Sequence, residues 1–316
     1  MKVLKFGGTS VGSAQRMKDV AKLITDGEQK IVVLSAMSGT TNTLVEISDY
    51  LYKKNPEGAN EIINKLENKY KQHIEELYST EEYKQKTLEF VKSVFDYIRS
   101  YTKDIFTLFE EKVILAQGEI ISTNMVTNYL CEQGVNAVLL PALEYMRTDK
   151  NSEPDTMYIR EKLRVQLANN PGADIYITQG YICRNAYGEI DNLQRGGSDY
   201  TASLVGAAVD ASEIQIWTDI DGMHDNDPRF VDNTSPVRHL QFEEAAELAY
   251  FGAKILHPTC VQPAKYANIP VRLLNTMEPS APGTLISNES EKGKIKAVAA
   301  KDNITAIKIK SSRMLL

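Results

Sequence analysis

The sequence predicts an α/β protein in which a largely parallel central sheet lies between two layers of helices, as an αβα sandwich. Three observations support this class. Short runs rich in β-branched residues recur along the 316 residues, helical patterns lie between most of these runs, and the hydrophobic content of 42% is enough for a sizeable core. Strands that alternate with helices are joined by crossover connections, which place helices on both faces of a parallel sheet.

The strands are expected where the β-branched runs occur. These runs are Val3–Phe6, Ile31–Ser35, Ala137–Leu140, Asp174–Thr178, Ile214–Thr218 and Val271–Leu274. Because helical patterns separate most of them, we expect neighbouring strands to run parallel.

The first strand runs directly into a glycine-rich turn that begins with Gly7 and Gly8, and a helix follows. The helix is predicted by Ser13, a suitable N-cap residue, and by apolar residues at helical spacing behind it. Glycines let backbone N–H groups close around phosphate oxygens, a helix N-terminus adds positive potential, and Lys5 adds a full positive charge. The turn therefore suits a polyphosphate. Its spacing matches neither the P-loop nor the dinucleotide fingerprint, and such glycine pairs also form simple turns.

Residues 50–110 follow a different pattern. Apolar residues recur there every three to four positions among dense lysine and glutamate, with a break near Ser79 and Thr80. This spacing predicts amphipathic helices. Because each stretch is too short for a sustained heptad repeat, we favour a helical insertion that packs within the chain over a coiled-coil site for a partner.

A domain boundary is expected near residue 295. The segment Glu291–Lys296 is mostly polar and contains a glycine, and residues 304–310 then alternate as in a strand. One unpaired strand cannot bury its own face. We therefore divide the chain into residues 1–295 and residues 296–316, the second being a linker and the truncated start of a further domain. On this division the chain is a piece of a longer protein.

Composition excludes several functional classes. The net charge of −6 and the pI near 5.4 argue against a general nucleic-acid binder, which needs a basic surface. Cys131, Cys183 and Cys260 form no C-x-x-C pair and predict reduced thiols rather than a disulfide framework or a zinc site. No apolar run approaches a membrane span, and Met1 leads into the first strand without room for a signal peptide. We expect a cytoplasmic protein with no nucleic-acid or membrane partner.

Six motifs make the sequence similar to a known family. They are KFGGTSVG at 5–12, GE at 118–119, QRGGSDY at 194–200, WTDIDG at 217–222, DPR at 227–229 and FGAKILHP at 251–258. In this order they resemble aspartokinase of the amino-acid kinase family, over residues 1 to about 295. The resemblance implies the amino-acid kinase fold for this catalytic region and an amino-acid-sensing ACT domain after it.

The resemblance also implies a reaction. Aspartokinases transfer the γ-phosphoryl group of ATP, used with Mg²⁺, to the β-carboxylate of L-aspartate, giving 4-phospho-L-aspartate on the way to lysine, threonine and methionine. Because the acceptor is already an anion, no general base is needed, and positioning and charge neutralisation can provide the catalysis. A homodimer of the full-length protein and a homoserine dehydrogenase fused beyond Leu316 are also implied as possible partners.

The matched motifs imply roles for individual residues toward the substrate. Lys5 would neutralise charge on the transferring phosphoryl group, and Asp199 would order the site or cap the helix that follows it. Glu119 would accept hydrogen bonds from the α-ammonium group of aspartate. The other implied substrate contacts are Thr41, Arg195 and Ser198. Of these, the arginine has a guanidinium fork that fits the α-carboxylate.

The implied nucleotide contacts surround ATP with cations and small polar groups. They are Lys5, Gly7, Gly8, Ser35, Thr218, Asp219, His224, Arg229 and Lys254. Mg²⁺ is expected to be held chiefly by phosphate oxygens and water, so no residue is assigned as a metal ligand. The sequence departs from the family pattern at His224, where many relatives carry tyrosine or another bulky residue, and at Gln194, where glycine is common. Neither change removes a charged group that the chemistry needs.

Two other kinds of function stay open on the sequence. A sister kinase for glutamate or another small acid would share the fold and the phosphate chemistry, although the RGGSD and FGAKILHP motifs favour aspartate. A noncatalytic sensing or scaffold subunit would not need to keep Lys5, Glu119, Arg195 and Asp219 together. A dehydrogenase within the chain is disfavoured because no G-x-G-x-x-G motif opens a βαβ unit.

Overall fold

The computed structural model describes residues 1–103, 105–193, 196–227, 230–251, 256–289 and 295–300, together with residues 305 and 308. Three predicted site residues, Arg195, Arg229 and Lys254, lie outside the described residues. The same holds for most of the strand expected at 304–310 and for residues 291–294 of the expected linker.

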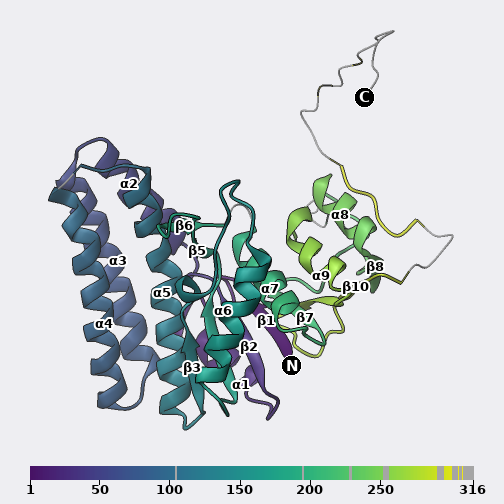
Figure 1. Cartoon of the computed structure of the whole chain (residues 1–316), viewed down its shortest axis with the longest axis horizontal. Helices are drawn as coiled ribbons and strands as arrows, with labels where there is room; N and C mark the ends of the chain where they lie inside the picture. Colours follow the sequence, from purple (N-terminus) through teal and green to yellow (C-terminus); the bar gives the residue numbers. More distant parts are fainter. Residues whose placement is uncertain are drawn as a thin grey trace.

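An eight-stranded sheet forms the centre of the described part (Figure 1). Its order is β3-β4-β2-β1-β7-β9-β10-β8, and all neighbours from β3 to β9 run parallel. At one edge, β10 is antiparallel to β9 and β8 is parallel to β10. The strands are β1 (Lys2–Phe6), β2 (Lys30–Leu34), β3 (Ala137–Leu140), β4 (Ile175–Gln179), β7 (Ile214–Thr218), β8 (His239–Gln241), β9 (Val271–Asn275) and β10 (Thr284–Ser287). The prediction of a largely parallel sheet is confirmed.

Helices cover both faces of this sheet, so the αβα sandwich is confirmed as well. Side chains alternate along β1: Leu4 and Phe6 enter one buried apolar cluster, whereas Val3 enters a second cluster on the opposite face. The helices are α1 (Ala14–Ile24), α2 (Thr40–Tyr52), α3 (Pro56–Leu77), α4 (Glu81–Ser100), α5 (Leu108–Glu132), α6 (Thr156–Asn169), α7 (Gly197–Ala208), α8 (Phe242–Tyr250) and α9 (Gln262–Tyr266).

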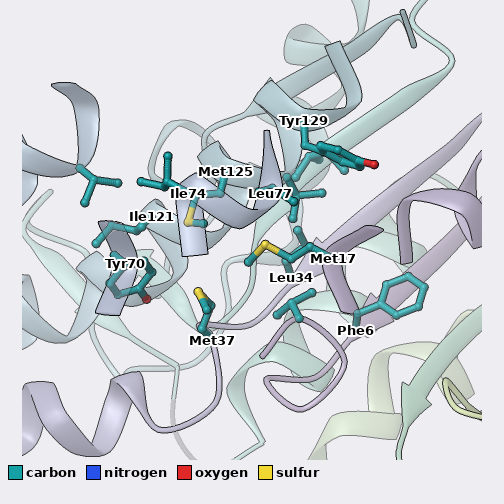
Figure 2. Packing of buried hydrophobic residues seen from close by; sticks show 14 of the residues in the cluster. Phe6, Met17, Leu34, Met37, Tyr70, Ile74, Leu77, Ile121, Met125 and Tyr129 are labelled. Carbon is teal, nitrogen blue, oxygen red and sulfur yellow. The ribbon is translucent and has the colours of Figure 1, made fainter. Parts of the chain in front are cut away.

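The helical insertion consists of α3 and α4, which stand at the left in Figure 1 with α2 and α5 beside them. The helical structure is interrupted between them at Ser79 and Thr80, as predicted. Their apolar faces join the same cluster as α1 and β2, so the insertion packs within the chain (Figure 2). Tyr78 extends this contact to α5, because its hydroxyl donates to the Met125 carbonyl at 2.7 Å.

The helix after the glycine turn begins where the sequence predicts. Ser13 has extended backbone angles, and its hydroxyl accepts the Arg16 N–H at 3.3 Å, as an N-cap residue does. Apolar residues on the inner face of α1 are fully buried against the sheet and α3. The turn therefore opens onto a firmly seated helix, which the phosphate hypothesis requires.

The expected strands agree with the observed ones to within about one residue, and the short strands were not predicted. β5 (Ile182–Arg184) and β6 (Ile190–Asn192) form a separate antiparallel ribbon, while β8 and β10 extend the main sheet. Cys131, Cys183 and Cys260 are free thiols, as predicted. None of the helices in the described residues combines the length and the apolarity that a membrane crossing requires.

Candidate active site

Four neighbouring strands end where the predicted site residues gather. β4, β2, β1 and β7 are adjacent and parallel, so their carboxyl ends meet at one edge of the sheet. Lys5 lies near the end of β1, Ser35 follows β2, and Thr218 ends β7. In open α/β sheets, ligands bind outside this edge, where connections leave toward opposite sides.

A cavity of about 600 Å³ opens at this edge. It is bounded by the β1 turn, the loop after β2, the middle of α5 and the segment that joins β4 to α7. Seven of the predicted site residues line it, namely Lys5, Gly8, Ser35, Thr41, Glu119, Ser198 and Asp199. The tertiary structure thus brings the predicted substrate and phosphoryl-transfer residues of the described part into one space.

Lys5 and Asp199 form an ion pair inside this cavity. The Lys5 ammonium lies 2.8 Å from Asp199 Oδ1, and the two side chains are only 12% and 14% exposed. Lys5 shares its sheet face with Val3, and that face is covered by α7, which carries Asp199. Asp199 does not cap α7: the N-cap position is Gly196, which makes no side-chain cap hydrogen bond. Of the two roles implied for Asp199, ordering the site is the one that this geometry fits.

Glu119 is a nearly buried carboxylate, 3% exposed, at the wall of the cavity. Its Oε1 accepts the Ala36 N–H at 3.1 Å, while Oε2 is buried with no hydrogen-bond partner among the described residues. Burial raises the pKa of Glu119 from its ordinary value of 4.5 to about 8, and the Ala36 hydrogen bond opposes this shift in part. A buried carboxylate oxygen without a partner is a strong site for a cationic ligand group.

The position of Glu119 depends on the glycine before it. α5 crosses so close to the loop after β2 that a Cβ at Gly118 would lie 2.8 Å from Ala36 Cβ. This close approach is what allows the Glu119 carboxylate to reach the Ala36 N–H. In the GE pair, Gly118 is therefore needed for the close packing of α5 on the loop, and Glu119 provides the carboxylate that bonds to the loop.

The first turn of α7 forms another wall of the cavity. Gly180, just after β4, permits its approach, since a Cβ there would lie 2.9 Å from the Ser198 Cα. Gly196 adopts the left-handed region, with φ of 75°, and starts the helix. Free N–H groups and the helix dipole make such a terminus favourable for an anion, and Ser198 adds a hydroxyl there.

The glycine turn is fastened to the neighbouring loop. The Ser38 N–H donates to the Gly8 carbonyl at 3.1 Å, and a Cβ at Gly8 would lie 2.8 Å from the Ala36 carbonyl oxygen. Gly7 donates its N–H to the Trp217 carbonyl of β7 at 3.4 Å and does not line the cavity. Gly8 therefore has a packing requirement of its own, whatever the turn binds.

The predicted nucleotide contacts at the end of β7 lie outside the cavity. Thr218 donates its hydroxyl to Asp219 Oδ1 at 3.1 Å. His224 pairs its Nδ1 with the Thr234 hydroxyl at 2.8 Å and forms a β-bridge with Pro236. Together with the undescribed positions of Arg229 and Lys254, this leaves the nucleotide assignments as predictions, and the substrate contact of Arg195 likewise stays a prediction. Within the described residues, no group of three or more His, Cys, Asp or Glu side chains could hold a metal ion.

Tyr181 is a cavity residue that the sequence reasoning missed. It follows Gly180 at the carboxyl end of β4 and has a φ of 67°, in the left-handed region that is unusual for tyrosine. Its N–H donates to Thr201 Oγ1 at 3.0 Å, and burial, with a contribution from the Glu119 charge, raises its pKa to about 12. The signal that could have found it is its place just after a strand in the parallel sheet.

Comparison with known proteins agrees with this geometry. Residues 1–275 match the amino acid kinase family, so the chain belongs to that family. Aspartokinases are among the proteins to which it is similar. Aspartokinase 1 of Arabidopsis thaliana chloroplasts is 35% identical over 99% of this chain and 57% of its own length, and lysine-sensitive aspartokinase 3 of Escherichia coli is 33% identical over 99% and 70%.

A solved structure extends the comparison to three dimensions. The Escherichia coli aspartokinase III complex with aspartate and ADP superposes with a TM-score of 0.83 at 33% identity, covering 92% of this chain and 65% of that chain. UMP kinase from Bacillus anthracis, with a TM-score of 0.53 and 14% identity, shares the fold. The chain spans little more than half the length of the Arabidopsis relative.

Proposed function

We propose that this chain transfers the γ-phosphoryl group of ATP to the β-carboxylate of L-aspartate. The observation that carries the proposal is Glu119, whose buried Oε2 has no partner among the described residues and whose side chain lines the same cavity as Lys5, Asp199 and Ser198. An amino acid needs one acceptor for its ammonium group and donors for its carboxylates, and this cavity offers both. The Escherichia coli structure, solved with aspartate and ADP, supports this choice of substrates.

L-Aspartate, the phosphoryl acceptor, would bind between the two ends of the cavity. Glu119 would accept the α-ammonium group, and the first turn of α7 with Ser198 and Arg195 would receive the α-carboxylate. Thr41, on α2, would contact the substrate from the opposite wall. This orientation directs the β-carboxylate toward Lys5. Binding in one fixed orientation lowers the barrier because the reacting atoms no longer have to find each other by diffusion.

Lys5 would then stabilise the phosphoryl group as it moves. The β-carboxylate oxygen attacks the γ-phosphorus, the bond to the β,γ-bridging oxygen breaks, and ADP leaves. No proton has to be removed, because the acceptor is ionised. Asp199 holds the Lys5 ammonium in place at 2.8 Å before the phosphates arrive. A preorganised cation in a partly dehydrated site is worth more than the same cation in water.

The nucleotide would lie across the ends of β1 and β7, near Gly7, Gly8, Ser35, Thr218, Asp219 and His224, with Arg229 and Lys254 adding charge. Mg²⁺ would accompany ATP and neutralise its phosphates. The described residues contain no cluster of acidic or imidazole ligands for a resident metal. This composition suits an ion held chiefly by phosphate and water.

The wider organisation of the protein is also proposed on the relatives. Residues 1–295 would form the catalytic domain, and residues 296–316 the linker and start of an ACT domain. The full-length protein would act as a cytoplasmic homodimer. Bifunctional aspartokinase/homoserine dehydrogenases occur among similar proteins, one of them 33% identical in Buchnera aphidicola, so a fused dehydrogenase is a further arrangement to test. Light scattering on the full-length protein measures the oligomeric state.

Acyl-phosphate formation tests the reaction. Product formed with ATP and Mg²⁺ is trapped with hydroxylamine, and L-aspartate is compared with L-glutamate. We expect a preference for aspartate, and we expect Lys5→Ala to lower kcat by about 10²- to 10³-fold, since removal of one preorganised donor typically costs that much. Thermal unfolding of the variant shows whether the fold is intact.

The possible outcomes separate the candidate functions. Preference for glutamate would assign the sister activity, and absence of product with both acids, from a folded chain that binds ATP, would favour a noncatalytic subunit. A folded Lys5→Ala variant with wild-type turnover would show that the proposed role of the lysine is wrong. Lys2→Ala is a suitable control, because Lys2 lies on the same strand and pairs with Glu28 at the surface.

A further inference from the structure

Helix α3 of the helical insertion touches the loop that lines the candidate active site. What we call the 36–42 loop consists of residues 36–39, which follow β2, and the first three residues of α2, and it contributes most of one cavity wall. Tyr70 on α3 is 1% exposed, and its hydroxyl lies 2.9 Å from the hydroxyl of Thr40, which is also 1% exposed. This buried pair joins the insertion to the residue directly before Thr41.

A second contact comes from the neighbouring residue of the same helix. The ammonium group of Lys69, an exposed side chain, donates to the Ser38 carbonyl at 3.2 Å and lies near Gly39 at the cavity wall. On its other side, the Ser38 N–H donates to the Gly8 carbonyl. Ser38 is therefore held from the insertion and from the glycine turn at the same time.

The buried contact also reaches toward Glu119. Thr40 is wedged between α3 and α5: a Cβ at Gly118 would lie 3.3 Å from the Thr40 methyl group. The Ala36 N–H at the start of the same loop is the partner of Glu119 Oε1. Burial raises the pKa of Tyr70, and the Glu119 charge contributes to this shift, which places the two groups in one electrostatic neighbourhood.

The surroundings of Tyr70 make it a rigid support. Its ring packs against Phe95 of α4, with centroids 5.9 Å apart, and belongs to the large apolar cluster that also contains Met37 (Figure 2). A side chain fixed by packing on two helices can hold a hydroxyl at a constant position. Residues 36–39 of the loop belong to no strand or helix, and α2 begins only at Thr40.

We propose that α3 is a functional part of the active site, in which Tyr70 and Lys69 are positioning residues that hold the 36–42 loop in place for the amino-acid substrate. This inference rests on the proposed function. It gives the helical insertion a role beyond packing: the insertion sets the wall that carries Thr41 and the backbone donor to Glu119. Neither residue touches the reacting atoms, and each acts through the loop.

Tyr70→Phe tests the buried contact, because it removes one hydroxyl and keeps the ring. We expect the KM for L-aspartate to rise about tenfold, with smaller changes in kcat and in the KM for ATP, since a small displacement of a binding wall has effects of this size or larger. Tyr78→Phe is the matched control. Its hydroxyl is also buried and hydrogen-bonded, but to the Met125 carbonyl, away from the cavity.

Lys69→Met tests the surface contact without a risk to folding, because Lys69 is exposed. We expect a rise of about threefold in the KM for L-aspartate, in keeping with the smaller effect of a solvated contact. Lys65→Met is its control. Lys65 lies one turn earlier on α3 and pairs with Glu61 at 2.6 Å, and within the described part of the chain it makes no hydrogen bond or ion pair to the loop.

Hydrogen–deuterium exchange of peptides covering 36–42 provides a readout that does not need activity. We expect faster exchange there in Tyr70→Phe and Lys69→Met than in Tyr78→Phe and Lys65→Met. If the wild type phosphorylates aspartate, the KM comparison decides, and equal values in test and control variants overturn the proposal. If the wild type does not phosphorylate aspartate, the proposed function fails, but the exchange comparison still tests the positioning role. Equal exchange rates in test and control variants overturn that role, and faster exchange in the test variants supports it.

Discussion

At the scale of single residues, the site depends on two charged groups that are buried in different ways. Lys5 has a partner, Asp199, and enters the cavity as half of an ion pair. Glu119 has one backbone donor and one oxygen without a partner among the described residues, and its burial favours the neutral form. The first arrangement keeps a cation ready for phosphate. The second creates an acceptor that becomes fully ionised when a cation binds beside it.

The raised pKa of Glu119 predicts a pH dependence. Only ionised Glu119 binds an ammonium group well, so kcat/KM for L-aspartate should fall about tenfold for each pH unit below a pKa near 8. Steady-state kinetics from pH 6 to 9 measure this acidic limb, the part of the pH profile in which kcat/KM falls as pH falls. Glu119→Gln should lower kcat/KM and remove the limb, and a limb that persists unchanged in this variant would contradict the assignment.

Glu119 also predicts how stability changes with pH. Because its folded pKa of about 8 lies above its ordinary value of 4.5, the folded chain binds more protons than the unfolded chain between these values. Stability contributed by this group is therefore lost as pH rises from about 4.5 to 8. Thermal unfolding should show a wild-type Tm that declines relative to that of Glu119→Gln across this window. A constant difference between the two would argue against a raised pKa.

At the scale of elements, the cavity exists because helices approach loops more closely than side chains normally permit. Gly180 lets the first turn of α7 come against the end of β4, and Gly118 lets α5 come against the loop after β2. Each close approach brings one functional side chain, Ser198 or Glu119, to the cavity. The two glycines therefore affect function indirectly, because they permit the short distances between elements that place Ser198 and Glu119 at the cavity.

Gly180→Ala should separate this effect from general destabilisation. The added Cβ meets the Ser198 backbone, which cannot rotate away, so the first turn of α7 must shift. We expect about 1–3 kcal/mol of lost stability and a rise of about tenfold in the KM for L-aspartate. Gly206→Ala, farther along α7, is the control, because the three atoms nearest to its Cβ all belong to side chains, with Ile214 Cδ1 at 2.5 Å and Cγ1 at 2.6 Å. An equal KM change in both variants would refute the explanation.

At the scale of the whole molecule, the sheet order places β1 at the centre, with β2 on one side and β7 on the other. Residues 295–300, near the end of the described chain, pack back against the part of the molecule that follows β7. Lys296 pairs with Glu244 of α8 at 3.0 Å, and the Val298 N–H donates to the Asp225 carbonyl at 2.7 Å, next to His224. Segment 295–300 is thus attached to the helix and loop that follow β7.

Lys296→Met should loosen that attachment. Lys296 is 9% exposed in its side chain, and loss of its ion pair should speed hydrogen exchange across 295–300 by about two- to fivefold, equivalent to a contact worth somewhat under 1 kcal/mol. Lys265→Met provides the comparison, since Lys265 pairs with the adjacent Glu243 from α9. Similar exchange in both variants would mean that the Lys296 pair does not hold the segment.

Much of the fold could be predicted because its signals are local. β2 and β7 are rich in β-branched residues, and α3 repeats its apolar residues at helical spacing, so each stretch indicates its own structure. β8 and β10 were missed because a strand of three or four residues with mixed composition has no period to detect. Tyr70 was missed as a site residue because nothing around it in the sequence indicates what it contacts. Tyr181 was missed although it lies just after a predicted strand.

The sequence by itself determined the class of fold, the family and the kinds of side chain that stand at the strand ends. Only the tertiary structure decided which of them meet: Lys5 with Asp199, Ala36 with Glu119 across 83 residues, and Thr40 with Tyr70 from the insertion. The physical reason is range. Periodicity and capping act over a few neighbouring residues, whereas these contacts depend on the order of strands in the sheet and on how closely glycines let helices approach it.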